Sequence, residues 1–185
     1  MSATSAPFGL RPVSHLSGGV IRTMQYTIDP AYTTAIYLGS AVKLHTDGTI
    51  RAAAAGDSLL GAFMGCEYTN QLGNRKVSPY WTGESNATDI ICYVTADPQI
   101  IYEIQADGSI ALTKVGESAD ITNATAGSTI TGVSGTTIAN GTAAAQATLQ
   151  VIGFSTVPDN APGDAYTIVR VKIAEHQLAA VYSGV

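Results

Sequence analysis

The side chains that could do chemistry in this sequence are few and widely separated. His15, His45 and His176 form no HExxH or His-rich pattern, the kind of spacing that brings imidazoles onto one zinc ion. Neither a G-x-S-x-G nucleophile elbow nor a phosphate-binding P-loop occurs. The sequence therefore predicts no metal site and no cofactor.

One motif of catalytic type is present, because Ser40 and Lys43 match S-x-x-K. That motif presents serine and lysine on one helical turn. Here it lies in a stretch of alternating residues, where positions three apart point to opposite faces of a strand. The companion motifs S-D-N and K-T-G are missing, so we interpret the match as accidental.

Four acidic residues and one histidine segment remain as candidates for general acid–base chemistry. The carboxylates cluster in the sequence as Glu103, Asp107, Glu117 and Asp120. A solvated acidic rim explains them better than an acid–base pair. Glu175-His176-Gln177 follows an expected strand and is interpreted as a polar strand end. No histidine has an evident partner in the sequence, so we predict that the protein is not an enzyme.

Two further residue pairs allow more than one interpretation. Tyr80 and Trp81 fit a binding platform at an interface, or core packing in which a polar tip caps an apolar body; core packing is favoured. Cys66 and Cys92 could pair, but the N-terminus has no apolar signal-peptide region. Two buried thiols are therefore expected.

The elements that must position these residues are strands, because the hydrophobic period is two from Val20 onward. Leu60, Ala62, Met64, Cys66 and Tyr68 share one face of a stretch that is apolar on both faces. Short runs of this kind are separated by Asp-Gly, Leu-Gly-Asn and Pro-Gly-Asp, which is typical of a β-sandwich or barrel. Helix is nearly absent.

One phrase occurs twice, as HTDGTIRAAAAGDS (45–58) and QADGSIALTKVGES (105–118). Asp47-Gly48 and Asp107-Gly108 suit two-residue hairpin turns, because glycine supplies the positive φ that such turns need. Gly56 and Gly116 mark a following corner. We expect each copy to be a hairpin plus a corner. We therefore interpret the repeat as part of the structural scaffold.

The fold expected from these signals is all-β, with two small β-barrel or sandwich-like modules at residues 20–95 and 96–185. Residues 1–19 are expected to form an extended N-terminal arm, since Pro7, Pro12 and Gly18-Gly19 oppose regular structure. A frayed terminus is the alternative. Residues 118–148, rich in Thr, Gly and Ala, are expected as an excursion of short strands or an ordered loop.

The amino-acid composition limits the classes of molecule that the protein is expected to bind. Only 12% of the 185 residues are charged, which suggests that some surface is covered by other molecules. The net charge of −5 comes from residues 96–185, which carry three Lys or Arg against eight Asp or Glu. Without a basic stripe, direct nucleic-acid binding is not expected. No run of 18 apolar residues occurs, so no membrane partner is expected either.

Four stretches resemble small head proteins of tailed bacteriophages, namely the decoration or cement proteins that bind the major capsid protein. They are SAPFGLRPV (5–13), the long stretch at 38–69, DPQIIYEIQADGSIA (97–111) and GDAYTIVRVKIAEHQ (163–177). The resembling turn-and-strand motif comprises Gly39, Val42, Leu44, Asp47, Gly48, Ala55, Gly56, Asp57, Leu59, Leu60 and Gly61. The resemblance implies a homotrimer on the outer capsid surface of the virion, made in the bacterial cytoplasm, with arms that cross capsid subunits.

The expected function is therefore capsid stabilisation by contact. The arm residues expected to touch the major capsid protein are Phe8, Leu10, Arg11, Val13 and Leu16. A virion-surface receptor- or glycan-binding module that uses Tyr80, Trp81 and residues 118–148 is the main alternative. A small β-barrel hydrolase is a second one, and it would need a nucleophile and a base that converge in a pocket.

Overall fold

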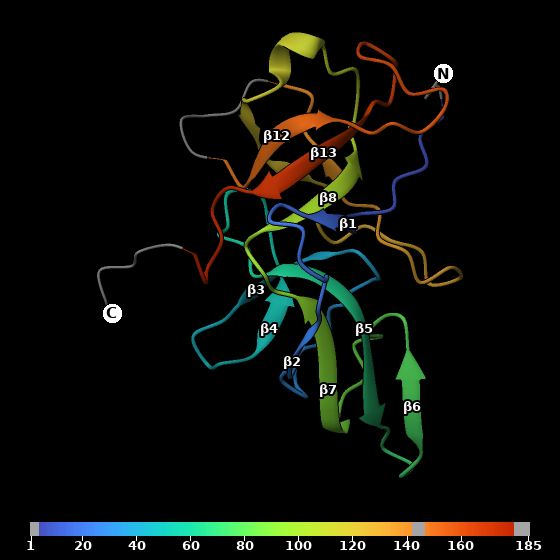
Figure 1. The fold of residues 1–185 in the computed structure, drawn as a ribbon. Coiled ribbons are helices and arrows are strands. Elements are labelled where there is room, and N and C mark those ends of the chain that lie inside the picture. Colours follow the sequence, from blue (N-terminus) through green and yellow to red (C-terminus); the bar gives the residue numbers. More distant parts are fainter. Residues whose placement is uncertain (1–3, 142–146, 180–185) are drawn as a thin grey trace.

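The computed structural model describes residues 4–141 and 147–179, which fold as antiparallel β-sheets (Figure 1). One sheet has six strands: β2 (Met24–Tyr26), β7 (Thr88–Thr95), β5 (Gly61–Thr69), β3 (Ala41–Leu44) and β4 (Ile50–Ala52) in spatial order, with β6 (Arg75–Ser78) paired to β5. The other has five, in the order β1 (Arg11–His15), β8 (Ile100–Gln105), β13 (Ile168–Ile173), β12 (Leu149–Phe154) and β9 (Ser118–Ala119).

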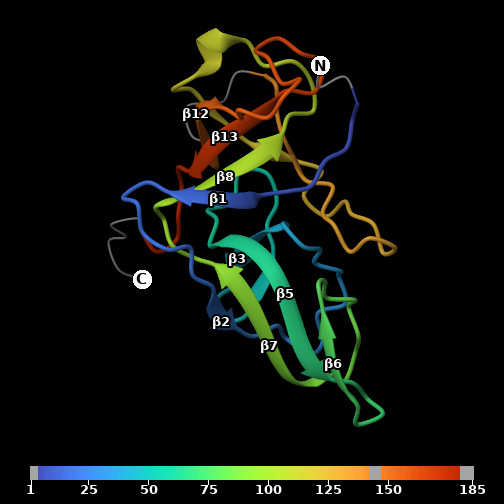
Figure 2. The same ribbon diagram turned by 45° about the vertical axis from the view of Figure 1, so that its right-hand side comes forward.

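Two smaller elements complete the described chain. The strands β10 (Ile121–Thr122) and β11 (Thr137–Ile138) pair with each other, and η1 (Leu112–Lys114) is a single turn of 3₁₀-helix. The predicted all-β class is confirmed. No sheet among the described residues closes into a barrel, and Figures 1 and 2 show the five-stranded sheet stacked above the six-stranded one, in a sandwich-like arrangement. No helix in the described ranges is long and apolar enough to cross a membrane.

The period of two in the sequence sets which side chains enter the core. In β13, Val169, Val171 and Ile173 are buried and alternate with half-buried residues. In β5, buried residues occupy both faces, so both faces of this strand are covered by other parts of the protein. The alternation seen in β13 lets a strand bury one face while the other meets solvent or a neighbouring segment.

The buried apolar residues form two clusters. One lies against the six-stranded sheet, and its largest fully buried side chains are Phe63, Tyr68 and Trp81. The other combines Tyr102 and its neighbours with Leu59 and other residues from the first half of the chain. Burying one large apolar side chain stabilises a fold by roughly 1.5–3 kcal/mol. Because the second cluster draws on both halves, the two halves do not pack independently.

The predicted N-terminal arm is extended, and most of its described part packs against the folded body. Residues 11–15 are the edge strand β1, which pairs antiparallel with β8. Leu10 is completely buried in the shared core, and its amide donates to the Gly39 carbonyl at 2.7 Å. Pro12 is tolerated because β1 lies at the edge of its sheet, where a missing N–H costs least. This segment is therefore part of the folded body.

The repeated phrase folds in two ways. In the first copy, β3 and β4 form a hairpin in which Leu44 lies opposite Ile50. The His45 amide bonds to the Thr49 carbonyl and the Gly48 amide to the His45 carbonyl, with Gly48 at φ +81°. The loop is thus a three-residue loop in which a type I turn ends at the left-handed Gly48, rather than the expected two-residue turn.

The second copy forms no hairpin, so that prediction is wrong. The amide of Asp107 bonds to the Ile138 carbonyl of the excursion at 3.0 Å, and the chain then enters η1. The corner, by contrast, is present in both copies. Gly56 and Gly116 have φ +80° and +95°, and each is followed by an acidic residue whose amide bonds three residues back.

Candidate functional site

The described N-terminal segment helps to form an apolar pocket of about 220 Å³. Its walls come from four parts of the chain: Phe8, Leu10, Arg11, Pro12, Leu38, Gly39, Met64 and Val133. A dry cavity of about 150 Å³ is large enough to bind benzene. The pocket can therefore accept one aliphatic or aromatic side chain.

Two glycines allow the chain segments behind the pocket to cross. Gly9 and Gly39 have φ +71° and +82°, in the left-handed region that favours glycine. A Cβ on Gly39 would lie 2.6 Å from the Phe8 carbonyl oxygen. The close approach that places Phe8 and Leu10 beside Leu38 therefore depends on the absence of side chains at these two positions.

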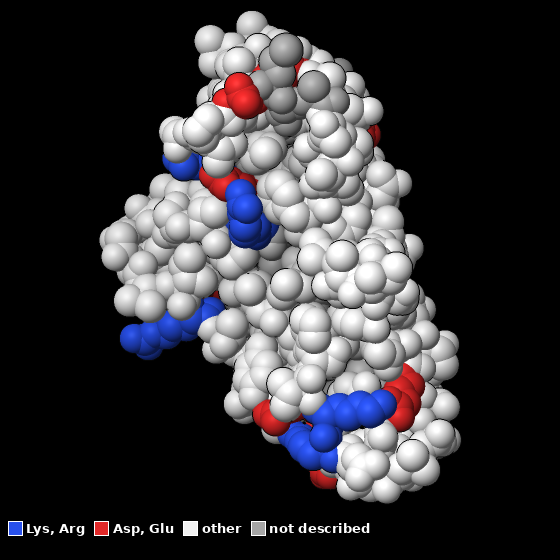
Figure 3. Space-filling model, turned by 90° about the vertical axis from the view of Figure 1, so that its right-hand side faces the viewer, with Lys and Arg blue, Asp and Glu red and all other residues white. Residues whose placement is uncertain are grey.

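Apart from Arg11 at its rim, the pocket is surrounded by segments that carry no formal charge. Residues 4–10, 30–42 and 121–141 contain no Lys, Arg, Asp or Glu, and we call the surface they form the uncharged face. Backbone bonds at 2.9 Å from Leu38 to Gly132 and from Ser134 to Leu38 hold two of these segments together. Figure 3 shows charged side chains in the left half and at the lower end of this view, while the broad middle of the right half has none.

A rigid turn projects one aliphatic side chain from the uncharged face. Ile130 is 95% exposed, which is the highest value among the large apolar residues described. The Ser128 hydroxyl accepts hydrogen bonds from the amides of Ile130 and Thr131, and the Tyr80 hydroxyl donates to the Thr129 carbonyl at 3.2 Å. Since the turn is held at its base and its tip, Ile130 stays in water as a fixed apolar projection.

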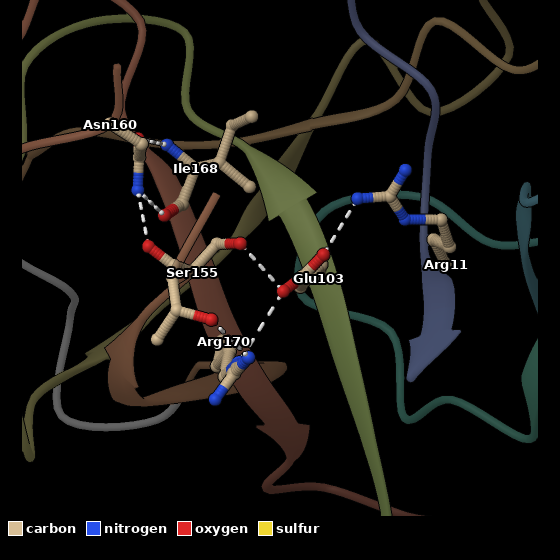
Figure 4. Close-up of polar contacts among 7 residues, drawn as sticks. Arg11, Glu103, Ser155, Asn160, Ile168 and Arg170 are labelled. Carbon is tan, nitrogen blue, oxygen red and sulfur yellow. Dashed lines mark hydrogen bonds and ion pairs between the residues drawn. The ribbon is translucent and has the colours of Figure 1, made fainter. Parts of the chain in front are cut away.

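At the rim of the pocket lies a cluster of charges shared by three adjacent strands (Figure 4). Glu103 of β8 is cross-strand neighbour to Arg11 on one side and Arg170 on the other. Its carboxylate accepts from Arg11 Nη2 at 2.6 Å, Arg170 Nε at 3.3 Å and Ser155 Oγ at 2.6 Å. Asn160 braces the loop over this cluster through bonds to Ser155 and Ile168.

The cluster keeps Glu103 ionised although the residue is only 4% exposed. Burial opposes ionisation, but the hydrogen bonds from Ser155, Arg11 and Arg170 outweigh it and lower the pKa of Glu103. Arg11 also lies over the Phe8 ring, 4.5 Å from its centroid. The half-exposed guanidinium of Arg11 is therefore held in place at the pocket rim.

The five residues predicted to touch the capsid are in different surroundings. Phe8, Leu10 and Arg11 line the pocket, whereas Leu16 is 62% exposed after the end of β1. Val13 is half-buried at a bulge in the β1–β8 pairing. Leu10 is completely buried, so the prediction that it is a free contact side chain is corrected; it forms part of the pocket wall and the core.

Tyr80 and Trp81 do not form an exposed aromatic platform. Trp81 is completely buried, meets Tyr68 edge to face and donates from Nε1 to the Tyr32 carbonyl at 3.0 Å. Tyr80 is half-buried and stacks on Tyr37 with 5.6 Å between ring centroids. Core packing, the favoured interpretation, is therefore what the structure shows for Trp81.

The candidate catalytic side chains each bond to different partners and do not meet one another. Ser40 Oγ lies in hydrogen-bonding distance of Tyr37 N and Ser134 Oγ, whereas Lys43 Nζ pairs with Asp57 at 2.7 Å, so the S-x-x-K residues do not meet. The acidic residues also have different partners: Glu103 binds the arginines, Glu117 binds Lys114, Asp107 accepts from the Asn140 amide and Asp120 from the Thr148 amide. No group of three or more potential metal ligands occurs within the ranges that the structure describes.

His15 has partners that the sequence did not reveal. His15 Nε2 lies 3.1 Å from Asp97 Oδ2 and its Nδ1 lies 3.0 Å from Ser17 Oγ. This is the order of carboxylate, imidazole and hydroxyl used in acyl transfer. However, Nδ1 also accepts from the Ser17 amide, and the Gly18 amide bonds to the His15 carbonyl. The contacts close the turn that ends β1, and none of these residues lines the apolar pocket.

Comparison with known proteins adds no relative: no family model, no curated protein and no solved structure matches this chain.

Proposed function

We propose that the protein is a structural component of a tailed-bacteriophage virion that binds the outer surface of the major capsid shell and stabilises it without catalysis. The observation that carries this proposal is the uncharged face, which combines a preformed apolar pocket with the projecting Ile130. The resemblance of four sequence stretches to decoration proteins supplies the partner.

The uncharged face has the composition of an interface centre. The cores of protein interfaces are depleted in charged residues, because a charge that leaves water without a partner costs free energy. Here the nearest charges are Arg11 and Glu103, which already neutralise each other at the pocket rim. A capsid side chain that enters the pocket would therefore remove apolar surface from water without leaving a buried charge unpaired.

Rigid surfaces suit a protein that acts by contact. A contact surface that is already ordered loses less entropy on binding than a flexible arm does. Phe8 is held by Arg11 and by the Gly9–Gly39 crossing, and Ile130 by the Ser128 turn. In place of the arm that orders on binding, we propose a preformed pocket and a preformed projection.

Self-association remains part of the proposal. A homotrimer would present three such faces to the shell, and linked sites raise avidity by roughly 10²–10⁴ without new contacts. The site of action would be the outer capsid surface, after synthesis in the bacterial cytoplasm. The alternative of receptor or glycan binding would need a surface other than Tyr80 and Trp81, because Trp81 is buried.

The proposal is tested by binding to capsid shells of the parent phage that lack this protein. Purified chain is mixed with shells, and bound protein is measured by co-sedimentation over a range of concentrations. Phe8→Ala and Ile130→Asp are expected to weaken binding at least tenfold each, the effect of about 1.4 kcal/mol. Leu72→Asp is the matched control, since Leu72 is 78% exposed in the β5–β6 turn, outside the uncharged face.

Thermal unfolding of each variant separates loss of binding from loss of fold. Ile130 is almost fully exposed, so Ile130→Asp should unfold at the same temperature as the natural chain. Failure of the natural chain to bind shells would refute the proposed function. Equal binding by Phe8→Ala, Ile130→Asp and Leu72→Asp would show that the uncharged face is not the contact surface.

A further inference from the structure

The two cysteines are direct cross-strand neighbours. Cys66 of β5 lies opposite Cys92 of β7 in the antiparallel ladder, between the pairs Gly65–Tyr93 and Glu67–Ile91. Both thiols are free and almost completely buried, with Cys66 1% and Cys92 0% exposed. Both side chains belong to the same buried apolar cluster of the six-stranded sheet.

The backbone geometry at this position matches that of a disulfide. Residues that face each other in an antiparallel pair have Cα atoms about 4.5 or 5.5 Å apart, depending on whether the pair exchanges hydrogen bonds. Disulfides span Cα separations of about 4.4–6.8 Å. The pair can therefore be joined with little movement of β5 or β7, whichever kind of pair it is.

We propose that Cys66 and Cys92 are a modification site at which a reversible intramolecular disulfide forms and ties β5 to β7. The oxidant is a low-molecular-weight disulfide such as oxidised glutathione. One protein thiolate attacks a glutathione sulfur, which forms a mixed disulfide and releases one reduced glutathione. The second thiolate then attacks the protein sulfur of that mixed disulfide. Two thiol protons are lost, one protein S–S bond forms, and the second glutathione leaves as a thiol.

The surroundings of the pair predict slow oxidation in the native state. The hydrogen bond with Cys66 and burial both raise the pKa of the Cys92 thiol, so little thiolate exists at neutral pH. The oxidant also has to reach two sulfurs that are buried in the core of the six-stranded sheet. This requires local opening of the pairing among β6, β5 and β7. The rate is therefore expected to rise with pH and with mild denaturant.

The bond would act on the part of the chain that lies between the two strands. Residues 67–91 form the closed loop, which includes β6 and its turn at Leu72. Closing such a loop removes conformations from the unfolded chain. The inference does not depend on the proposed function; for a virion protein it would mean a thiol form inside the reducing cell and a more stable form after release.

The test uses the full natural chain, purified with reductant and then equilibrated in mixtures of reduced and oxidised glutathione. One set is kept native, and a second is unfolded in urea and refolded in the same mixtures. After an acid quench, thiols are alkylated in denaturant and counted by intact mass. The expected count falls from two to none, with the chain still monomeric on a non-reducing gel. The unfolding temperature is expected to rise by roughly 5–10 °C.

Single variants identify the bond. Cys66→Ser and Cys92→Ser should each retain one thiol or carry one glutathione, and their unfolding temperatures should not respond to a change of redox mixture. If serine in the core prevents folding, Cys66→Ala and Cys92→Ala serve the same purpose. Two alkylatable thiols after both routes in the most oxidising mixture would overturn the proposal, as would oxidation only to mixed or intermolecular disulfides.

Discussion

Arg11 lies directly opposite Glu103 in the β1–β8 ladder, and its Nη2 donates to Glu103 Oε2 over 2.6 Å. The same carboxylate accepts from Arg170 on the other neighbouring strand. One buried acid thus connects the N-terminal segment to the rest of the five-stranded sheet, and it also fixes the arginine at the rim of the apolar pocket. Residues almost a hundred positions apart in the sequence are paired by this contact.

Replacing Glu103 by glutamine is expected to destabilise the protein by about 1–3 kcal/mol. The change keeps the shape of the side chain but removes the negative charge that strengthens its hydrogen bonds with Arg11 and Arg170. A hydrogen bond to a charged group contributes about 1.5–3 kcal/mol to stability. Urea unfolding measures the loss. Glu117→Gln is the control, because its exposed pair with Lys114 should be worth less than about 1 kcal/mol. Equal losses in both variants would contradict the structural role of the cluster.

Acid should weaken the same cluster. The folded-state pKa of Glu103 is lowered, so its stabilising effect is complete above the usual value of 4.5 and is lost as pH falls below it. The free energy of unfolding of the natural chain is therefore expected to fall more steeply below about pH 4.5 than that of Glu103→Gln. Parallel pH profiles for the two proteins would count against this assignment.

Leu10→Ala is expected to cost about 2–5 kcal/mol, whereas Leu16→Ala should change stability by less than about 0.5 kcal/mol. Leu10 is completely buried in the core shared by both halves, while Leu16 is 62% exposed. Both changes remove the same atoms from the same N-terminal segment. Chemical denaturation of the two variants therefore distinguishes an integrated strand, which predicts unequal effects, from a free arm, which predicts two small ones.

Gly39→Ala should destabilise the fold more than Gly48→Ala does. Both glycines have positive φ, +82° and +81°, so alanine is strained at either position by about 1–2 kcal/mol. Only at Gly39 would the new Cβ also press on a backbone atom, the Phe8 carbonyl oxygen, because nothing lies within 4 Å at Gly48. Thermal unfolding of the two variants measures the difference, and equal shifts would show that the crossing behind the pocket is less tight than described.

Stability should also fall as the pH drops through the range of histidine. Burial lowers the pKa of His176 below 6.5, and Asp97 and the Leu60 backbone offset this only in part. The unfolded chain then takes up a proton before the folded chain does, so the stabilisation is complete above pH 6.5 and decreases below it. His176→Gln should flatten the pH dependence of the unfolding free energy between about pH 5 and 7, as measured by urea unfolding at each pH, and an unchanged slope would contradict this assignment.

The sequence by itself determined the class of the fold, because alternation with a period of two leaves few ways to bury β13 and β7 except in sheets. It also determined the corners at Gly56 and Gly116, since positive φ is a local property that glycine meets cheaply. Local chemistry was sufficient in these cases because the decisive contacts lie within a few residues.

Tertiary structure decided everything that depends on distant partners. The two Asp-Gly phrases are locally alike, yet Asp47 lies in a hairpin turn while Asp107 bonds across to Ile138. The sequence around Leu10 predicts a side chain on a free arm. In the fold, the Leu10 amide donates to the carbonyl of Gly39, which lies more than twenty residues away in the sequence. The pocket likewise needs Phe8, Met64 and Val133 together. Such contacts depend on which segments the shared core brings side by side, and that information is spread over the whole chain.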